Sequence, residues 1–218
     1  MSISENIKAL KASLPEDVTL VAVSKTKPVN ELMEAYDTGQ RIFGENKIQE
    51  MAAKWEEMPK DIEWHMIGHI QRNKVKYMAS FVSLIHAVDS LRLLTEINKQ
   101  AAKHERVIRC LLQIKIADED SKFGLDAADA KAILDSEELK TLTNIEIVGL
   151  MGMATFTDNQ LQLKKEFDYL NTLYQELKGQ HADWQTLSMG MSGDYPIAIE
   201  HGSTMVRVGS AIFGARNY

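Results

Sequence analysis

The chain carries an early apolar run, Leu20-Val21-Ala22-Val23-Ser24-Lys25, that is β-branched in character and ends in a lysine. Such a run is typical of a strand buried on both faces, as in a parallel sheet. Lys25 then lies at the carboxyl end of that strand, where strand–helix barrels perform their chemistry. Apolar surroundings lower the pKa of a lysine amine and make it a candidate for Schiff-base formation with an aldehyde. The alternative is a lysine that only reaches water from a strand end, and this run alone favours that alternative.

Short apolar runs alternate with helical patterns along the rest of the chain. The predicted strands span residues 19–24, 41–44, 63–67, 82–87, 108–116, 146–150, 186–189 and 205–208. The predicted helices between them cover residues 29–38, 47–58, 73–79, 91–101, 127–134 and 163–177. This alternation predicts an α/β fold, a (β/α)8 TIM barrel that forms a single domain over residues 1–218. An open doubly wound sheet is the alternative, because the chain is shorter than most barrels.

An extra helix is predicted at the N-terminus, ahead of the first strand. Apolar residues recur at helical spacing between residues 3 and 14. Ser2 and Glu5 match a capping box at the start of this segment. We therefore expect a short amphipathic helix that packs on the body of the barrel.

The composition is that of a soluble globular protein, with 44% hydrophobic and 26% charged residues. The formal net charge of −6 argues against sequence-independent binding to nucleic acid or to an anionic membrane. No apolar run is long enough to span a membrane, and the N-terminus lacks the core of a signal peptide. The single cysteine, Cys110, can form no internal disulfide, so we expect a protein of the reducing cytoplasm.

Two glycine-containing segments late in the chain have the composition of phosphate-binding turns. They are Ser188-Met189-Gly190-Met191-Ser192-Gly193-Asp194, ahead of a predicted helix at 195–200, and Arg207-Val208-Gly209-Ser210-Ala211. Small residues let backbone N–H groups approach an anion, and barrels often bind phosphate after their last two strands. Each segment alone is more typical of a tight turn. Together with a lysine at a strand end, they indicate an aldehyde that carries a phosphate, and pyridoxal phosphate is the natural candidate.

The sequence offers no convincing metal site. His65 and His69 are four residues apart, but Gly68 lies between them and no glutamate follows His65, so the helical zinc motif is not met. The acidic residues 118–120 begin like a calcium loop, but the glycine and the glutamate that such a loop requires are replaced. We therefore predict no metal ligand.

Five stretches of the chain resemble the pyridoxal phosphate homeostasis protein family, also called the proline synthetase co-transcribed family. They are Ala22-Val23-Ser24-Lys25-Thr26-Lys27-Pro28, Phe43-Gly44-Glu45-Asn46, His65-Met66-Ile67-Gly68-His69-Ile70-Gln71-Arg72-Asn73-Lys74, Leu187-Ser188-Met189-Gly190-Met191-Ser192 and the run from Gly202 to Gly214. The stretches lie in the same order as in the family and extend nearly from end to end. The resemblance implies a barrel like the N-terminal domain of alanine racemase, which holds pyridoxal 5'-phosphate as an internal aldimine.

The resemblance also implies a set of cofactor-binding residues. They are Lys25, Asn46, Ser192, Arg207, Gly209 and Ser210, and we add Gly193 from the first glycine-containing segment. Lys25 corresponds to the Schiff-base lysine of the family, and Arg207 to the arginine that faces the pyridine nitrogen. Ser192, Gly209 and Ser210 correspond to positions that hold the phosphate, largely through backbone N–H groups, and Asn46 lies close to the cofactor.

The implied function is intracellular pyridoxal phosphate homeostasis, as a carrier or buffer without robust catalysis and without catalytic residues. Pyridoxal enzymes use a protonated ring nitrogen as an electron sink, and the permanently charged Arg207 discourages that protonation. Racemases of this fold take a second acid/base from another domain across a dimer, and a chain that ends at Tyr218 has no room for that domain.

Two alternatives remain open at this point. The first is a small pyridoxal-phosphate-dependent amino-acid racemase, and the second is a sugar-phosphate barrel enzyme that uses no pyridoxal. The predicted partners are pyridoxal phosphate and the apo-enzymes that use it, and the predicted oligomeric state is a monomer.

Overall fold

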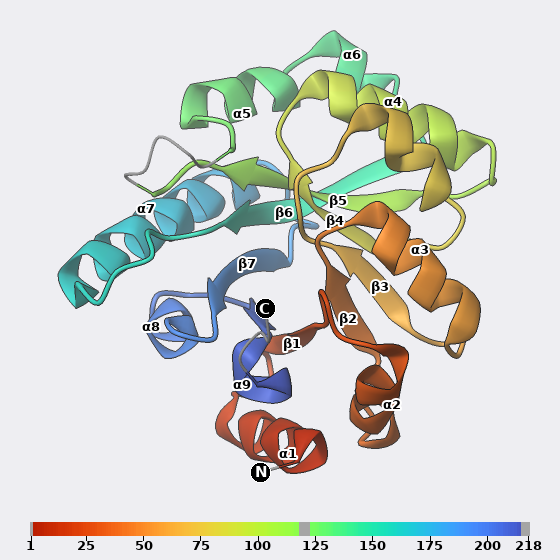
Figure 1. Cartoon of the computed structure of the whole chain (residues 1–218). Coiled ribbons are helices and arrows are strands. Elements are labelled where there is room, and N and C mark those ends of the chain that lie inside the picture. The colour runs from red at the N-terminus through yellow and green to blue at the C-terminus, as the bar shows by residue number, and fades with distance from the viewer. Residues whose placement is uncertain (1, 118–122, 215–218) are drawn as a thin grey trace.

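The computed structural model describes residues 2–117 and 123–214, and these form a closed barrel of parallel strands (Figure 1). The strands pair in chain order, and β1 closes the barrel against β8. They are β1 (Thr19–Val23), β2 (Ile42–Glu45), β3 (Glu63–Met66), β4 (Leu84–Val88), β5 (Ile108–Ile114), β6 (Ile145–Gly152), β7 (Thr186–Met191) and β8 (Met205–Val208). The predicted barrel is confirmed, and the alternative of an open sheet is wrong.

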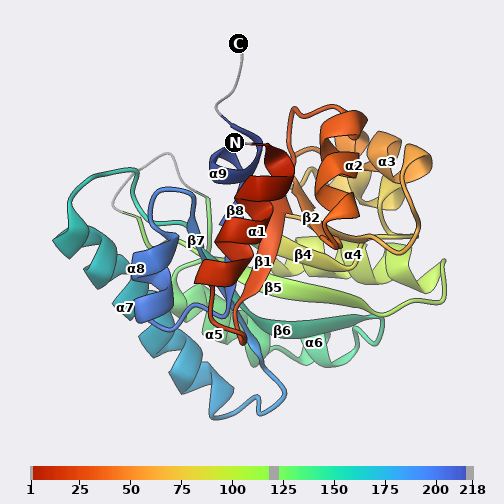
Figure 2. The same ribbon diagram turned by 90° about the horizontal axis from the view of Figure 1, so that it is seen from below.

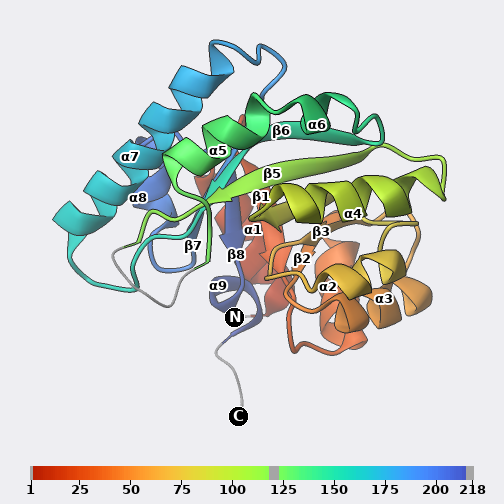
Figure 3. The same ribbon diagram turned by 90° about the horizontal axis from the view of Figure 1, so that it is seen from above.

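Helices follow the strands in sequence and surround the barrel (Figures 2 and 3). They are α1 (Ile3–Ser13), α2 (Val29–Asp37), α3 (Ile48–Glu57), the 3₁₀ helix η1 (Arg72–Tyr77), α4 (Leu91–Ala102), α5 (Ala127–Leu134), α6 (Glu137–Lys140), α7 (Gln160–Lys178), α8 (Tyr195–Glu200) and α9 (Ser210–Phe213). The short helix α6 was not predicted, because a single turn is too short to show a hydrophobic period. No helix among the described residues is both long and apolar enough to cross a membrane.

The N-terminal helix α1 begins as predicted. The backbone N–H of Glu5 donates to Ser2 Oγ at 3.2 Å, and the backbone N–H of Ser2 donates to Glu5 Oε2 at 2.8 Å, which completes a capping box. The helix packs beside α9, where the Asn6 side-chain amide donates to the backbone oxygen of Ile212 at 2.9 Å (Figure 2). The predicted amphipathic helix is therefore present, and it supports the last turn of the chain that the structure describes.

Alternating side chains of the strands form two apolar layers. The inner layer fills the barrel and includes Val21, Leu84, Leu111, Met151 and Met205. The outer layer packs between the strands and the surrounding helices, and its residues occupy the intervening positions along each strand. Lys25 lies four residues after Val21, just beyond the end of β1, so it stands at the carboxyl-end opening of the barrel.

Candidate functional site

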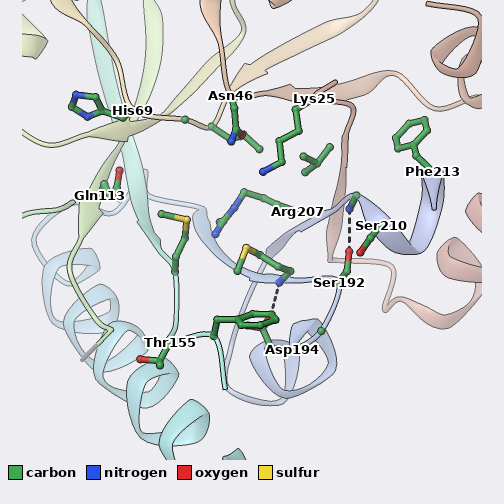
Figure 4. Close-up of a pocket in the computed structure, with 18 of the residues that line it drawn as sticks. Lys25, Asn46, His69, Gln113, Thr155, Ser192, Asp194, Arg207, Ser210 and Phe213 are labelled. Carbon is green, nitrogen blue, oxygen red and sulfur yellow. Dashed lines mark hydrogen bonds between the residues drawn. The ribbon is translucent and has the colours of Figure 1, made fainter. Parts of the chain in front are cut away.

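A cavity of about 710 Å³ lies at the carboxyl ends of the strands (Figure 4). All seven residues that we predicted to bind a cofactor line it: Lys25, Asn46, Ser192, Gly193, Arg207, Gly209 and Ser210. The fold therefore brings together residues that are separated by up to 185 positions in the chain. Sequence reasoning did not identify several other lining residues, among them Lys27, Gln113 and Phe213.

The backbone is fixed on both sides of Lys25. The preceding residue, Ser24, donates from Oγ to Glu45 Oε1 at 2.6 Å. The following residue, Thr26, has a left-handed backbone with φ 65°, and its N–H donates to Glu50 Oε1 at 2.5 Å. Carboxylates of β2 and α3 thus hold the turn that carries Lys25, and the lysine side chain points into the cavity (Figure 4).

A buried ammonium joins these two carboxylates. Lys54 Nζ lies 2.7 Å from Glu45 Oε1 and 2.8 Å from Glu50 Oε1, and it also donates to the backbone oxygen of Ser24 at 2.8 Å. The Glu45 side chain is fully buried, and burial raises the pKa of its carboxyl while the charge of Lys54 opposes the shift. The network of Ser24, Glu45, Glu50 and Lys54 therefore connects the first two strand ends to α3 through the residue that precedes Lys25.

Asn46 reaches the cavity because β2 and β3 approach closely at their ends. A Cβ atom on Gly68, which follows β3, would lie only 2.4 Å from the backbone oxygen of Asn46. Only glycine therefore permits this contact between the two turns. Asn46 stands next to Lys25 on the same side of the cavity (Figure 4).

The turns after β7 and β8 form a small polar wall of the cavity, opposite Lys25 and Asn46 (Figure 4). Ser192 Oγ accepts hydrogen bonds from the backbone N–H groups of Gly209 at 3.2 Å and Ala211 at 3.5 Å, the first of which is drawn in Figure 4. A Cβ on Gly193 would meet no atom within 4 Å, so this residue adjoins open space. The Ser192 hydroxyl oxygen occupies the point on which these two N–H groups converge, and a phosphate oxygen in its place would accept the same hydrogen bonds.

Arg207 lies inside the barrel with its guanidinium directed to the floor of the cavity (Figure 4). Its Nη1 donates to the backbone oxygen of Ser188 at 2.9 Å and to Ser188 Oγ at 2.6 Å, and its Nη2 donates to the backbone oxygen of Gly152 at 2.9 Å. Burial lowers the pKa of Arg207 to about 10, and the nearby charge of Asp194 opposes the shift. The side chain is therefore a cation at neutral pH.

Two polar residues near strand ends do not line the cavity. His86 sits inside β4 and is fully buried, because that strand continues to Val88. Lys115 directly follows β5, which ends at Ile114, and its side chain is exposed.

His69 does line the cavity, but at its edge. The ring stacks on Phe123 with 4.4 Å between centroids, and Nδ1 lies 3.4 Å from Asp89 Oδ2. Figure 4 shows the imidazole directed away from Lys25. Within the part of the chain that the structure describes, no cluster of histidine, cysteine and acidic residues could hold a metal, and the acidic residues 118–120 fall outside that part.

Because of two buried histidines, we expect the folded state to be less stable in acid. Burial, with a smaller contribution from the charge of Arg109, lowers the pKa of His65 to about 3, and burial also lowers the pKa of His86 well below its usual value. The unfolded chain binds protons at these histidines below about pH 6.5, whereas the folded chain does not, so stability is lost as the pH falls. His65 alone should reduce the free energy of unfolding by about 2.5 kcal/mol between pH 6 and pH 4.

Urea unfolding at several pH values measures this loss. The variant His65→Asn should flatten the pH dependence, and replacing the exposed His104 with glutamine should leave it as in the wild type. An identical pH slope in His65→Asn and in the wild type would contradict the assignment.

Comparison with known proteins places the chain in a family. A family model described as the N-terminal domain of alanine racemase matches residues 1–217. The pyridoxal phosphate homeostasis protein of Vibrio alginolyticus is 40% identical, over 100% of this chain and 99% of its own length. This chain belongs to the pyridoxal phosphate homeostasis protein family. The protein of that name from Escherichia coli K12 is 38% identical, over 94% of this chain and 88% of its own length.

Solved structures agree with the family assignment and with the fold. PipY of Synechococcus elongatus, solved without PLP, superimposes with a TM-score of 0.91 at 37% identity and covers 98% of this chain and 100% of its own. A second PipY structure, with PLP bound, has a TM-score of 0.88 at 36% identity. Alanine racemase of Clostridium difficile has a TM-score of 0.83 at 14% identity, covering 100% of this chain and 57% of its own, which supports the predicted barrel type.

Proposed function

We propose that this protein binds pyridoxal 5'-phosphate through Lys25 and serves as an intracellular carrier or buffer of that cofactor. The observation that carries the proposal is a single cavity that contains three matched features. These are an amine at the end of β1, a buried guanidinium on β8, and a pair of backbone N–H groups after β8 that converge on the Ser192 hydroxyl after β7. They match the aldehyde, the ring nitrogen and the phosphate of the cofactor, respectively.

Each residue has a distinct role in this proposal. Lys25 Nζ would form a C=N bond with the aldehyde carbon, with loss of water, and the buried network that holds Ser24 would keep the amine directed into the cavity. The turns at 192–193 and 209–210 would hold the phosphate through backbone N–H groups and serine hydroxyls. Arg207 would donate to the ring nitrogen and keep it unprotonated. When bound, the cofactor supplies an aldehyde that exchanges reversibly between amines.

The relatives support this function. Proteins that are 38–40% identical to this chain are named for pyridoxal phosphate homeostasis, and PipY, at 36% identity, has been solved with PLP bound. Reversible attachment suits a buffer, because a primary amine from elsewhere can displace Lys25 and release the cofactor. We propose that apo-enzymes which need the cofactor are the recipients, and that the protein acts as a cytoplasmic monomer.

We further propose that the loaded protein does not turn over amino acids. A permanently charged Arg207 facing the ring nitrogen would weaken the electron sink that such turnover requires. The test is to incubate the loaded protein with a panel of L- and D-amino acids and to follow racemisation and transamination. We expect no sustained turnover. Turnover that disappears in Lys25→Ala would contradict the carrier function and support a racemase.

A further inference from the structure

A column of hydrogen-bonded side chains extends from Arg207 across the interior of the barrel. Ser188 Oγ on β7 accepts from Arg207 Nη1 at 2.6 Å and lies 3.0 Å from His86 Nδ1 on β4. His86 Nε2 lies 3.0 Å from His65 Nδ1 on β3. All four side chains are at least 96% buried, and none of the three beyond Arg207 lines the cavity. We name Ser188, His86 and His65 the relay.

The relay residues face inward because of strand alternation. Leu187 and Met189 flank Ser188 and belong to the outer apolar layer, as do Trp64 beside His65 and Ile85 beside His86. The side chain of each relay residue therefore points into the barrel. At the equivalent positions, neighbouring strands carry apolar side chains. Polar residues at such positions need hydrogen-bond partners, and here the partners are one another and Arg207.

The chemistry of the donors fixes the direction of the hydrogen bonds. A guanidinium can only donate, so Ser188 Oγ accepts from Arg207. The hydroxyl proton of Ser188 then has His86 Nδ1 as its acceptor, which leaves His86 protonated at Nε2 and donating to His65 Nδ1. The reverse direction would leave the buried Ser188 hydroxyl proton with no acceptor among the described residues, which is costly.

This direction has an electrostatic consequence. Every member of the relay turns a lone pair toward Arg207, so the aligned dipoles stabilise the buried cation and polarise one another. All three hydrogen bonds that Arg207 makes with the described residues go to neutral oxygens. A hydrogen-bonded carboxylate would neutralise the charge of the guanidinium. The relay instead stabilises the guanidinium and leaves its charge in place.

We propose that Ser188, His86 and His65 are positioning residues, which hold Arg207 as a cation in the orientation that contacts the ring nitrogen of the bound cofactor. The inference rests on the proposed function and assigns it three residues that do not touch the cavity. The relay acts only through Arg207, so it should influence recognition of the ring nitrogen and leave recognition of the phosphate unchanged.

The test compares pyridoxal phosphate with its analogue in which a C–H group replaces the ring nitrogen. The ratio of their dissociation constants, measured by absorbance titration, reports the contact between Arg207 and the nitrogen. A general loss of packing would weaken both ligands and leave the ratio unchanged. We expect the wild type to prefer pyridoxal phosphate at least tenfold, and Ser188→Ala to reduce that preference about fivefold.

Matched variants complete the design. Thr186 is buried on the same strand two residues earlier and faces the same way, so Thr186→Val removes a hydroxyl outside the relay and should keep the wild-type ratio. His86→Asn retains an amide oxygen that can accept from Ser188, and it should preserve more of the preference than His86→Leu. If Ser188→Ala fails to fold, the comparison of His86→Asn with His86→Leu still tests the inference.

The outcomes separate this inference from the function on which it rests. If the wild type binds both ligands and the ratio is the same in Ser188→Ala, or in both His86 variants, the relay has no positioning role. If the wild type binds neither ligand, the proposed function is wrong and the inference falls with it. A reduced ratio in Ser188→Ala with an unchanged ratio in Thr186→Val would support the relay.

Discussion

Replacing Lys25 with alanine should abolish covalent retention of pyridoxal phosphate while the barrel stays folded. Lys25 lies beyond the end of β1 and lines the cavity, so neither apolar layer loses a side chain. The turns after β7 and β8 and the Arg207 guanidinium remain, and weak non-covalent binding should persist. We expect the dissociation constant to rise by about two orders of magnitude, which corresponds to roughly 3 kcal/mol. The measurement is the visible absorbance of protein that has been loaded with cofactor and then dialysed.

Lys25→Arg is the matched variant for this experiment. It keeps a cation at the same place but cannot form a C=N bond with an aldehyde under these conditions. If Lys25→Arg and Lys25→Ala both lose the visible band, covalent chemistry rather than charge explains retention. A wild-type visible band in Lys25→Ala after dialysis would contradict the assignment of Lys25.

Replacing Lys54 with methionine should destabilise the fold more than any substitution at the cavity surface. Lys54 is the cation of the buried network, and its removal leaves the fully buried carboxylate of Glu45 without its ion-pair partner. Breaking a buried pair from one side typically costs about 3–5 kcal/mol. Because the network also holds Ser24, the turn that carries Lys25 should loosen, and cofactor retention should fall together with stability.

Urea unfolding followed by circular dichroism measures the effect. The double variant Glu45→Leu with Lys54→Met removes both charges and should recover part of the loss, because no unpaired charge remains. Replacing the exposed Lys165 of α7 with methionine should change the free energy of unfolding by less than about 0.5 kcal/mol. A Lys54→Met variant as stable as Lys165→Met would show that the buried network does not hold the turn.

Much of the cavity could be predicted because strand ends can be read from sequence. The apolar run at 20–23 locates Lys25, and the glycine and serine residues after the last two strands locate the polar wall. In a parallel barrel the carboxyl ends of all strands share one face, so these segments had to meet. The resemblance then supplied the roles of Arg207 and Asn46, which periodicity alone does not assign.

The buried networks could not be predicted in this way. Lys54 lies on α3, where a lysine ordinarily faces solvent, but Glu45 at the end of β2 draws it inward. Ser188 and His86 are 102 residues apart, and their hydrogen bond depends on the register of strands that are not neighbours. The sequence did contain one signal, which was polar residues at alternate positions in otherwise apolar strands. That pattern indicates polar side chains with partners inside the barrel, but it does not say which residues pair.

Borohydride reduction of the loaded protein, followed by peptide mapping, tests the central claim most directly. Reduction fixes a C=N bond as a stable amine, so the modified residue can be identified by mass. The account predicts one pyridoxyl adduct per chain, located on Lys25, and no adduct in Lys25→Ala. An adduct on another lysine, or none on protein that retains the cofactor after dialysis, would contradict it.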